Sequence, residues 1–223
     1  MRRMIGSMLI VLSAAAAVLA TPSTQIWNPS TDVKTTGVYH LDVDNYFTVN
    51  DVSSGGYSFP TDLGLLYGLL PGLEVGVDSS TPQANLSTSS LLFNAKYGIA
   101  ENGALPALAI GGFNFGNHAA DPNILYALAA KTFNFGRLSA GYFSGRESVL
   151  GSGQNSGPML TWDKSITDKL WLCIDYAGSN STYGSTFYGG SWKFASNVSV
   201  LFAYGTWNNG AKPVITTQLD IDI

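Results

Sequence analysis

Apolar residues alternate with polar or small residues along most of this chain, and this period of two constrains the fold more than any other feature. In one clear stretch, Leu91, Phe93, Ala95, Tyr97 and Ile99 alternate with Leu92, Asn94, Lys96 and Gly98. A helix would mix the two sets on every face, whereas a strand places them on opposite faces. The alternation therefore predicts β-strands with one apolar face and one polar or small face.

Two kinds of break separate the predicted strands. Tight breaks occur at Pro71-Gly72, 100–103, Phe135-Gly136, 166–168 and 195–197, and longer polar breaks at 49–57, 79–88, 116–122, 147–157, 178–184 and 208–212. The two kinds alternate strictly, as expected where short periplasmic turns alternate with longer outer loops. The order predicts an all-β, antiparallel, up-and-down transmembrane barrel of about twelve strands. We expect these strands at 37–48, 58–70, 73–78, 89–99, 104–115, 123–134, 137–146, 158–165, 169–177, 185–194, 198–207 and 213–223.

Composition separates this barrel from a soluble β-sandwich, which also alternates with period two. Hydrophobic residues make up 45% of the chain and charged residues only 12%, about half the charge of a soluble domain. A sandwich would expose Lys, Glu and Thr on its outer face, whereas the less apolar face here is mostly Gly, Ala and Ser. We therefore favour the barrel. The one cysteine, Cys173, excludes an internal disulfide.

The N-terminus is typical of an export signal. Met1-Arg2-Arg3 is followed by an apolar run that reaches Ala20, just before Thr21-Pro22. A basic start, an apolar centre and small residues before the cut are the pattern of a secretory signal peptide. We expect residues 1–20 to be removed. Residues 21–36 either enter the barrel as a small plug or lie in the periplasm, and we favour the periplasm. Residues 37–223 form the barrel.

The last predicted strand carries a resemblance to a known class. Ile215, Thr217, Leu219, Ile221 and Ile223 share one face, and this alternation resembles the C-terminal strand of bacterial outer-membrane β-barrel proteins of the porin-like class. That strand usually ends on an aromatic residue, whereas this chain ends on Ile223. The resemblance implies insertion into the lipid of a Gram-negative outer membrane by the barrel-assembly machinery, which recognises the final strand.

Charged residues on the predicted inner face divide into two walls. The acids are Asp42, Asp44, Asp62, Glu74, Asp78, Asp163 and Asp175, with Asp220 and Asp222 on the last strand, and the bases are Lys96, Lys131 and Arg137. Charges inside such a barrel need water or a partner. A transverse field of this kind resembles the constriction of general porins. It predicts a narrow channel for passive diffusion of small solutes or ions, with a weak cation preference. The alternative is a non-conducting structural or interaction barrel, closed by ion pairs.

Catalysis and cofactor binding are not expected. The two histidines, His40 and His118, do not match the His-x-Ser pair of the outer-membrane phospholipases, so an outer-leaflet enzyme ranks third. His40, Asp42 and Asp44 share one face, but three side chains in one row rarely converge on an ion. We interpret them as a polar lumen wall without a metal. The net charge of −4 provides no basic footprint for nucleic acid.

Overall fold

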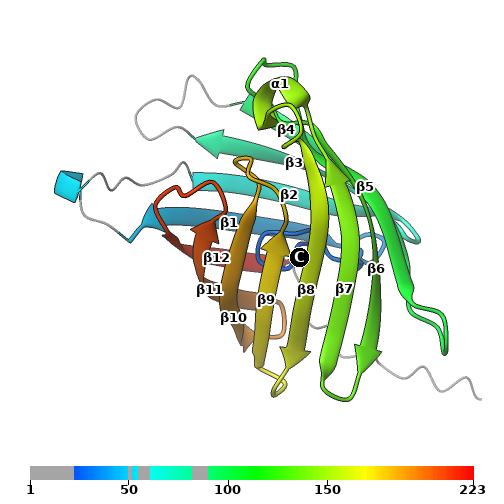
Figure 1. The fold of residues 1–223 in the computed structure, drawn as a ribbon. Coiled ribbons are helices and arrows are strands. Elements are labelled where there is room, and N and C mark those ends of the chain that lie inside the picture. The colour runs from blue at the N-terminus through cyan, green and yellow to red at the C-terminus, as the bar shows by residue number, and fades with distance from the viewer. Residues whose placement is uncertain (1–22, 50–51, 55–60, 82–89) are drawn as a thin grey trace, which may run out of the picture.

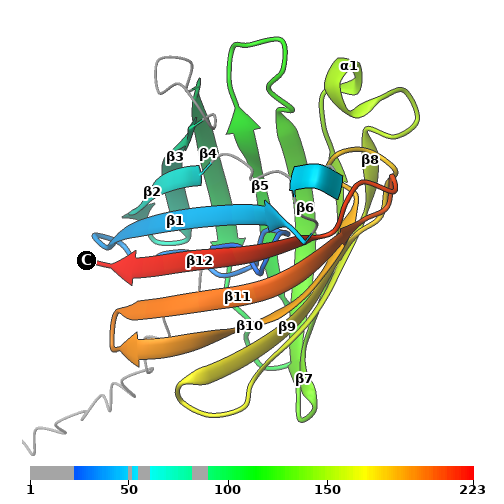
Figure 2. The same ribbon diagram turned by 90° about the vertical axis from the view of Figure 1, so that its left-hand side faces the viewer.

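The computed structural model describes residues 23–49, 52–54, 61–81 and 90–223, so the predicted signal peptide lies outside the described residues. Twelve antiparallel strands form a closed barrel in which each strand pairs with its neighbours in sequence and β12 closes onto β1 (Figures 1 and 2). The strands are β1 Tyr39–Thr48, β2 Thr61–Leu70, β3 Leu73–Thr81, β4 Ser90–Ile99, β5 Ala107–Phe115, β6 Ile124–Phe133, β7 Gly136–Ser144, β8 Ser156–Ser165, β9 Leu170–Ala177, β10 Ser185–Ala195, β11 Val198–Trp207 and β12 Val214–Asp222. The predicted fold class and strand number are confirmed.

The first and last strands close the barrel. The backbone of Ile223 exchanges two hydrogen bonds with Tyr39, of 2.8 and 3.0 Å. The register then runs from His40 opposite Asp222 to Thr48 opposite Val214. Because this pairing joins the first and last strands, no strand edge remains open in the bilayer, where an unpaired backbone group would be costly.

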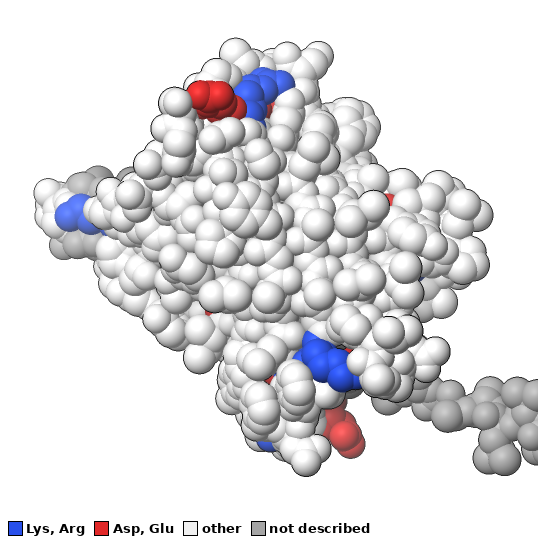
Figure 3. All heavy atoms as spheres, turned by 45° about the vertical axis from the view of Figure 1, so that its right-hand side comes forward, with Lys and Arg blue, Asp and Glu red and all other residues white. Residues whose placement is uncertain are grey.

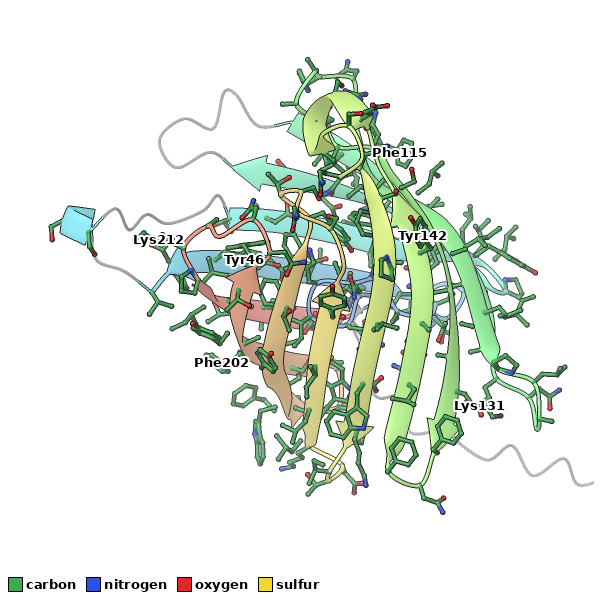
Figure 4. The ribbon with its side chains drawn as sticks, in the orientation of Figure 1. Tyr46, Phe115, Lys131, Tyr142, Phe202 and Lys212 are labelled. Atoms are coloured by element: carbon green, nitrogen blue, oxygen red, sulfur yellow. The ribbon has the colours of Figure 1, made fainter. Side chains whose placement is uncertain are left out.

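The outer face of the barrel is apolar. Phe202, near the middle of β11, is 57% exposed and points away from the barrel in Figure 4. Charged side chains on the face shown in Figure 3 lie near its margins, and the broad region between them carries none. This distribution is what a wall in contact with lipid requires.

Little helix accompanies the strands. The helix α1, Glu147–Leu150, lies in the loop between β7 and β8, and a short 3₁₀ turn, η1, covers Val52–Ser54. Among the residues described, no helix is long and apolar enough to cross a membrane.

The lipid-facing position of Phe202 leads to a test of the fold. We expect Phe202→Arg to destabilise the refolded barrel by about 2–4 kcal/mol, because a cation at the bilayer midplane loses its hydration. The free energy of unfolding in denaturant, measured in lipid vesicles, checks this. The matched control is Ala211→Arg, since Ala211 is exposed in the loop beyond β11 and an arginine there stays in water. Equal stability of the two variants would contradict the proposed membrane face.

Candidate functional site

The N-terminal residues 23–34, which we call the lumen segment, lie inside the barrel (Figures 1 and 2). The segment makes a tight turn in which Gln25 N donates to Asn28 O at 2.7 Å, and Thr24 bridges to Pro29. Gln25 and Asn28 are 0% and 1% exposed. The expectation that residues 21–36 lie in the periplasm is therefore wrong for this stretch. Its polar groups find partners on the barrel wall that the sequence does not reveal.

Asp175, on β9, anchors the tip of the lumen segment. Its Oδ2 accepts hydrogen bonds from the backbone N–H groups of Ile26, Trp27 and Asn28, at 3.1, 2.8 and 2.8 Å. Its Oδ1 accepts from Asn28 Nδ2 at 2.6 Å and from Thr161 Oγ1 at 2.7 Å. Asp175 is 1% exposed. Asp175 does point inward as predicted, but it holds the segment and does not present a free charge to the lumen.

Trp27 fills the middle of the barrel with an aromatic cluster. Its ring stacks on Tyr183 and Phe187, with centroids 5.6 and 5.5 Å apart, and meets Tyr46 and Trp207 edge-on at 5.7 and 5.3 Å. Its indole N–H donates to Tyr183 O at 2.9 Å. These contacts fix the segment as part of the packed interior. In the sequence, the apolar pair Ile26-Trp27 within a mostly polar segment is the signal of this role.

The close approach of the segment to the wall requires glycine. A Cβ built at Gly68, on the inner face of β2, would lie 2.0 Å from Thr35 O. No side chain larger than hydrogen fits between the two backbones. Gly68 N and O also bond to Val38 O and Gly37 N, at 3.0 and 2.8 Å. The backbone just before β1 therefore packs directly against the inner face of β2.

Glu74 and Lys96 form the second anchor. They are direct register partners on β3 and β4, and Lys96 Nζ lies 3.1 Å from Glu74 Oε1. Glu74 Oε2 also accepts from Ser23 Oγ and Lys34 N, at 2.9 and 2.8 Å, while Lys96 Nζ donates to Ser23 O at 2.7 Å. The predicted base therefore neutralises an acid on the neighbouring strand and does not face one across the lumen.

Arg137 and Asp163 form the third anchor. They are register partners on β7 and β8. Arg137 Nε lies 2.9 Å from Asp163 Oδ2, and its Nη1 lies 2.7 Å from Asp32 of the lumen segment. These residues line a cavity of about 460 Å³ together with Lys169, Trp171 and others. The end of the segment is thus held by a cation from the wall.

Lys131 does not belong to the inner face, and its prediction as a lumen base is wrong. On β6 the buried residues are Ile124, Tyr126, Leu128 and Ala130, so Lys131 has the opposite, outward parity. Its Nζ lies 2.6 Å from Glu101 Oε1 in the turn before β5. The hydrogen bonds from Lys131 and Thr132 hold the pKa of Glu101 below its ordinary value. Lys131 is therefore a rim residue, as its place in Figure 4 also shows.

The remaining predicted acids gather around a second cavity. Asp42, Asp44, Asp62 and Asp78, which we call the acidic cluster, line a cavity of about 170 Å³ that the lumen segment borders on another side. Asp78 accepts a hydrogen bond from Asn94. Within the described part of the chain, no Lys, Arg or His is within ion-pair distance of these four carboxylates. These four predicted acids thus lie together on the inner wall, while Glu74, Asp163 and Asp175 are engaged by other partners.

Each of the two histidines lies beside aspartate side chains. His40 Nδ1 lies 2.7 Å from Asp222 and Nε2 lies 3.4 Å from Asp220, and Lys34 Nζ lies 3.0 Å from the same Asp222. His118 is in an outer loop beside Asp121. No described group of three or more His, Cys, Asp or Glu side chains is arranged to hold a metal ion. Cys173 is buried and free.

Comparison with known proteins adds the class of the fold. No protein-family model and no curated protein sequence matches the chain. Among solved structures, the KdgM porin superposes with a TM-score of 0.58 at 10% identity, covering 82% of this chain and 98% of that chain. The COG4313 outer membrane channel from Pseudomonas putida F1 superposes with a TM-score of 0.54 at 13% identity, covering 87% of this chain and 98% of that chain. The chain has a porin fold. The porin-like class predicted from the final strand and the alternation is confirmed at this level.

Proposed function

We propose that this porin-fold barrel is an outer-membrane channel for passive diffusion of small solutes, narrow and weakly cation-preferring. The observation that carries the proposal is the acidic cluster, whose carboxylates line an interior cavity without a basic partner in the described residues. A wall of unpaired acids lowers the free energy of cations in the lumen and raises that of anions. The similarity to solved outer-membrane channels supports the same class of function.

The lumen segment sets the width of this channel. Twelve strands enclose a lumen between the filled interior of an eight-stranded barrel and the aqueous pore of a sixteen-stranded one. The segment takes up part of that space, with the cavity of about 170 Å³ on one side and the cavity of about 460 Å³ towards the periplasm. Solutes then pass the segment along β1 to β4, the side on which the acidic cluster lies.

The location follows from the same proposal. Residues 1–20 direct export and are cleaved, β12 is recognised by the barrel-assembly machinery, and the apolar outer face contacts lipid. The similarity to outer-membrane porins supports this placement. We expect neither a cofactor nor catalysis.

Planar-bilayer recording tests the channel directly. Under a KCl gradient we expect steps of stable conductance with a reversal potential that indicates a mild preference for K⁺. Replacing Asp42 and Asp78 by Asn should reduce that potential by roughly half or more, since ring charge sets selectivity in a pore. The matched control is Glu147→Gln, at an exposed acid of α1 that lines neither cavity. Silence from protein shown to be folded by its heat-modifiable gel shift would overturn the proposal.

A non-conducting interaction barrel is the second candidate. Two ion pairs favour it, Glu74–Lys96 and Arg137–Asp163, which also hold the lumen segment. In each pair the charges neutralise one another and are not available to interact with solutes. The recording described above separates the two candidates. A folded barrel that never conducts supports the second.

A further inference from the structure

The acidic cluster occupies two adjacent rows of the sheet. In one row Asp44 on β1 lies directly opposite Asp62 on β2. In the next, Asp42 and Asp78 both pair with Gly64, which lies between them on β2. A Cβ at Gly64 would come within 2.1 Å of Asp42 Oδ2, so the Asp42 carboxylate leans over this glycine. Three neighbouring strands therefore bring four carboxylates to one patch of the inner wall.

No Lys, Arg or His among the described residues forms an ion pair with this patch, although His40 and Lys96 line the same cavity. The Oδ1 atoms of Asp44 and Asp62 are buried and have no hydrogen-bond partner. The nearby bases are engaged with other acids, His40 with Asp220 and Asp222, and Lys96 with Glu74. Burying carboxylates without a partner is costly unless a cation or a donor compensates them. A cation that is not part of the chain would therefore stabilise the cluster.

The same cavity has an aromatic side. Trp27, Phe113, Tyr126 and Tyr183 also line it. Tyr46 follows Asp44 on the inner face of β1, points into the barrel in Figure 4, and packs edge-on against Trp27. Aromatic faces attract cations through their quadrupole, most strongly where water is excluded, and they suit ammonium ions that carry methyl or methylene groups.

The volume of the cavity and the arrangement of its acids indicate which class of cation it can bind. The described acids are not arranged as a metal site. The cavity of about 170 Å³ is close to the engineered cavity of roughly 150 Å³ that accepts benzene. We propose that this cavity binds a small organic ammonium ion, with its charge on the acidic cluster and its alkyl groups against Trp27 and the tyrosines. The inference rests on the proposed channel, and it names the class of solute that the channel selects.

Calorimetric titration of the refolded, detergent-solubilised protein with choline chloride tests the inference. The comparison ligand is 3,3-dimethylbutan-1-ol, which has nearly the same shape without the charge. We expect choline to bind at least about tenfold more tightly than the alcohol, since the charge supplies both the carboxylate and the aromatic attraction. This comparison needs no variant. Equal affinities for the two ligands, or no binding of choline, would overturn the proposal.

Variants locate the site. We expect the double variant Asp44→Asn and Asp62→Asn to weaken choline binding at least about tenfold, whereas Asp168→Asn, far from the cavity, should leave it unchanged. Unchanged affinity in the double variant would contradict the assignment. Bilayer recording separates this failure from failure of the channel. Conduction without choline binding would contradict the proposed ammonium site and support the channel. Choline binding without conduction would support the site and contradict the channel.

Discussion

Deletion of residues 23–34 is expected to raise the single-channel conductance of the refolded protein by several-fold, because a twelve-stranded lumen then loses a chain that occupies it. The segment contributes no strand to the barrel, so the twelve strands and their hydrogen bonds remain. Trp27, partly buried among four aromatic rings, is removed with it. Planar-bilayer recording of both proteins under the same salt measures the change.

A length-matched replacement of residues 23–34 by Gly and Ser provides the control for this deletion. It keeps a tether of the same length but lacks Trp27, Asn28 and the other groups that the wall holds. We expect its conductance to approach that of the deletion, with more noise as the tether moves in and out. A folded deletion variant with the conductance of the full chain would show that solutes do not pass the segment.

Replacement of Asp175 by Ala is expected to release the lumen segment from the barrel wall. Three backbone N–H groups lose a carboxylate acceptor, and each hydrogen bond to a charged group is worth about 1.5–3 kcal/mol. Water can replace part of these hydrogen bonds in the variant. We therefore expect the local stability of the segment to fall by about 3–5 kcal/mol. Hydrogen–deuterium exchange at residues 26–28 should accelerate accordingly, and the conductance should rise towards that of the deletion.

The matched variants separate anchoring from general damage. Asp175→Asn retains the size of the side chain and one acceptor oxygen but lacks the charge, so its exchange rates should fall between those of Ala and Asp. Asp168→Ala, in the exposed periplasmic turn, should leave exchange at residues 26–28 unchanged. Equal protection of Ile26, Trp27 and Asn28 in the wild type and in Asp175→Ala would refute the anchor.

Whether a charged side chain faces the lumen or the outside depends on its position in the alternation of its strand, and a shift of one residue changes the face. Lys96 and Arg137 point inward as predicted, because the alternation runs unbroken through β4 and β7. Lys131 does not, because the buried set on β6 is even-numbered and a shift of one residue reverses the face. Even for the charged residues assigned to the correct face, the sequence does not show which residue each one pairs with. The pairing of Glu74 with Lys96 depends on the register between β3 and β4.

The sequence by itself determined the architecture of this protein. Strand number, order and turn positions follow from the period-two alternation and the spacing of Gly, Pro and polar breaks, which are local features. Only the tertiary structure decided what occupies the lumen. The contacts that hold Ile26, Trp27 and Asn28 come from Asp175, 147 to 149 residues away along the chain. A short polar segment has no periodicity that indicates its partner, so its place becomes apparent only when the closed barrel brings the anchoring carboxylate to it.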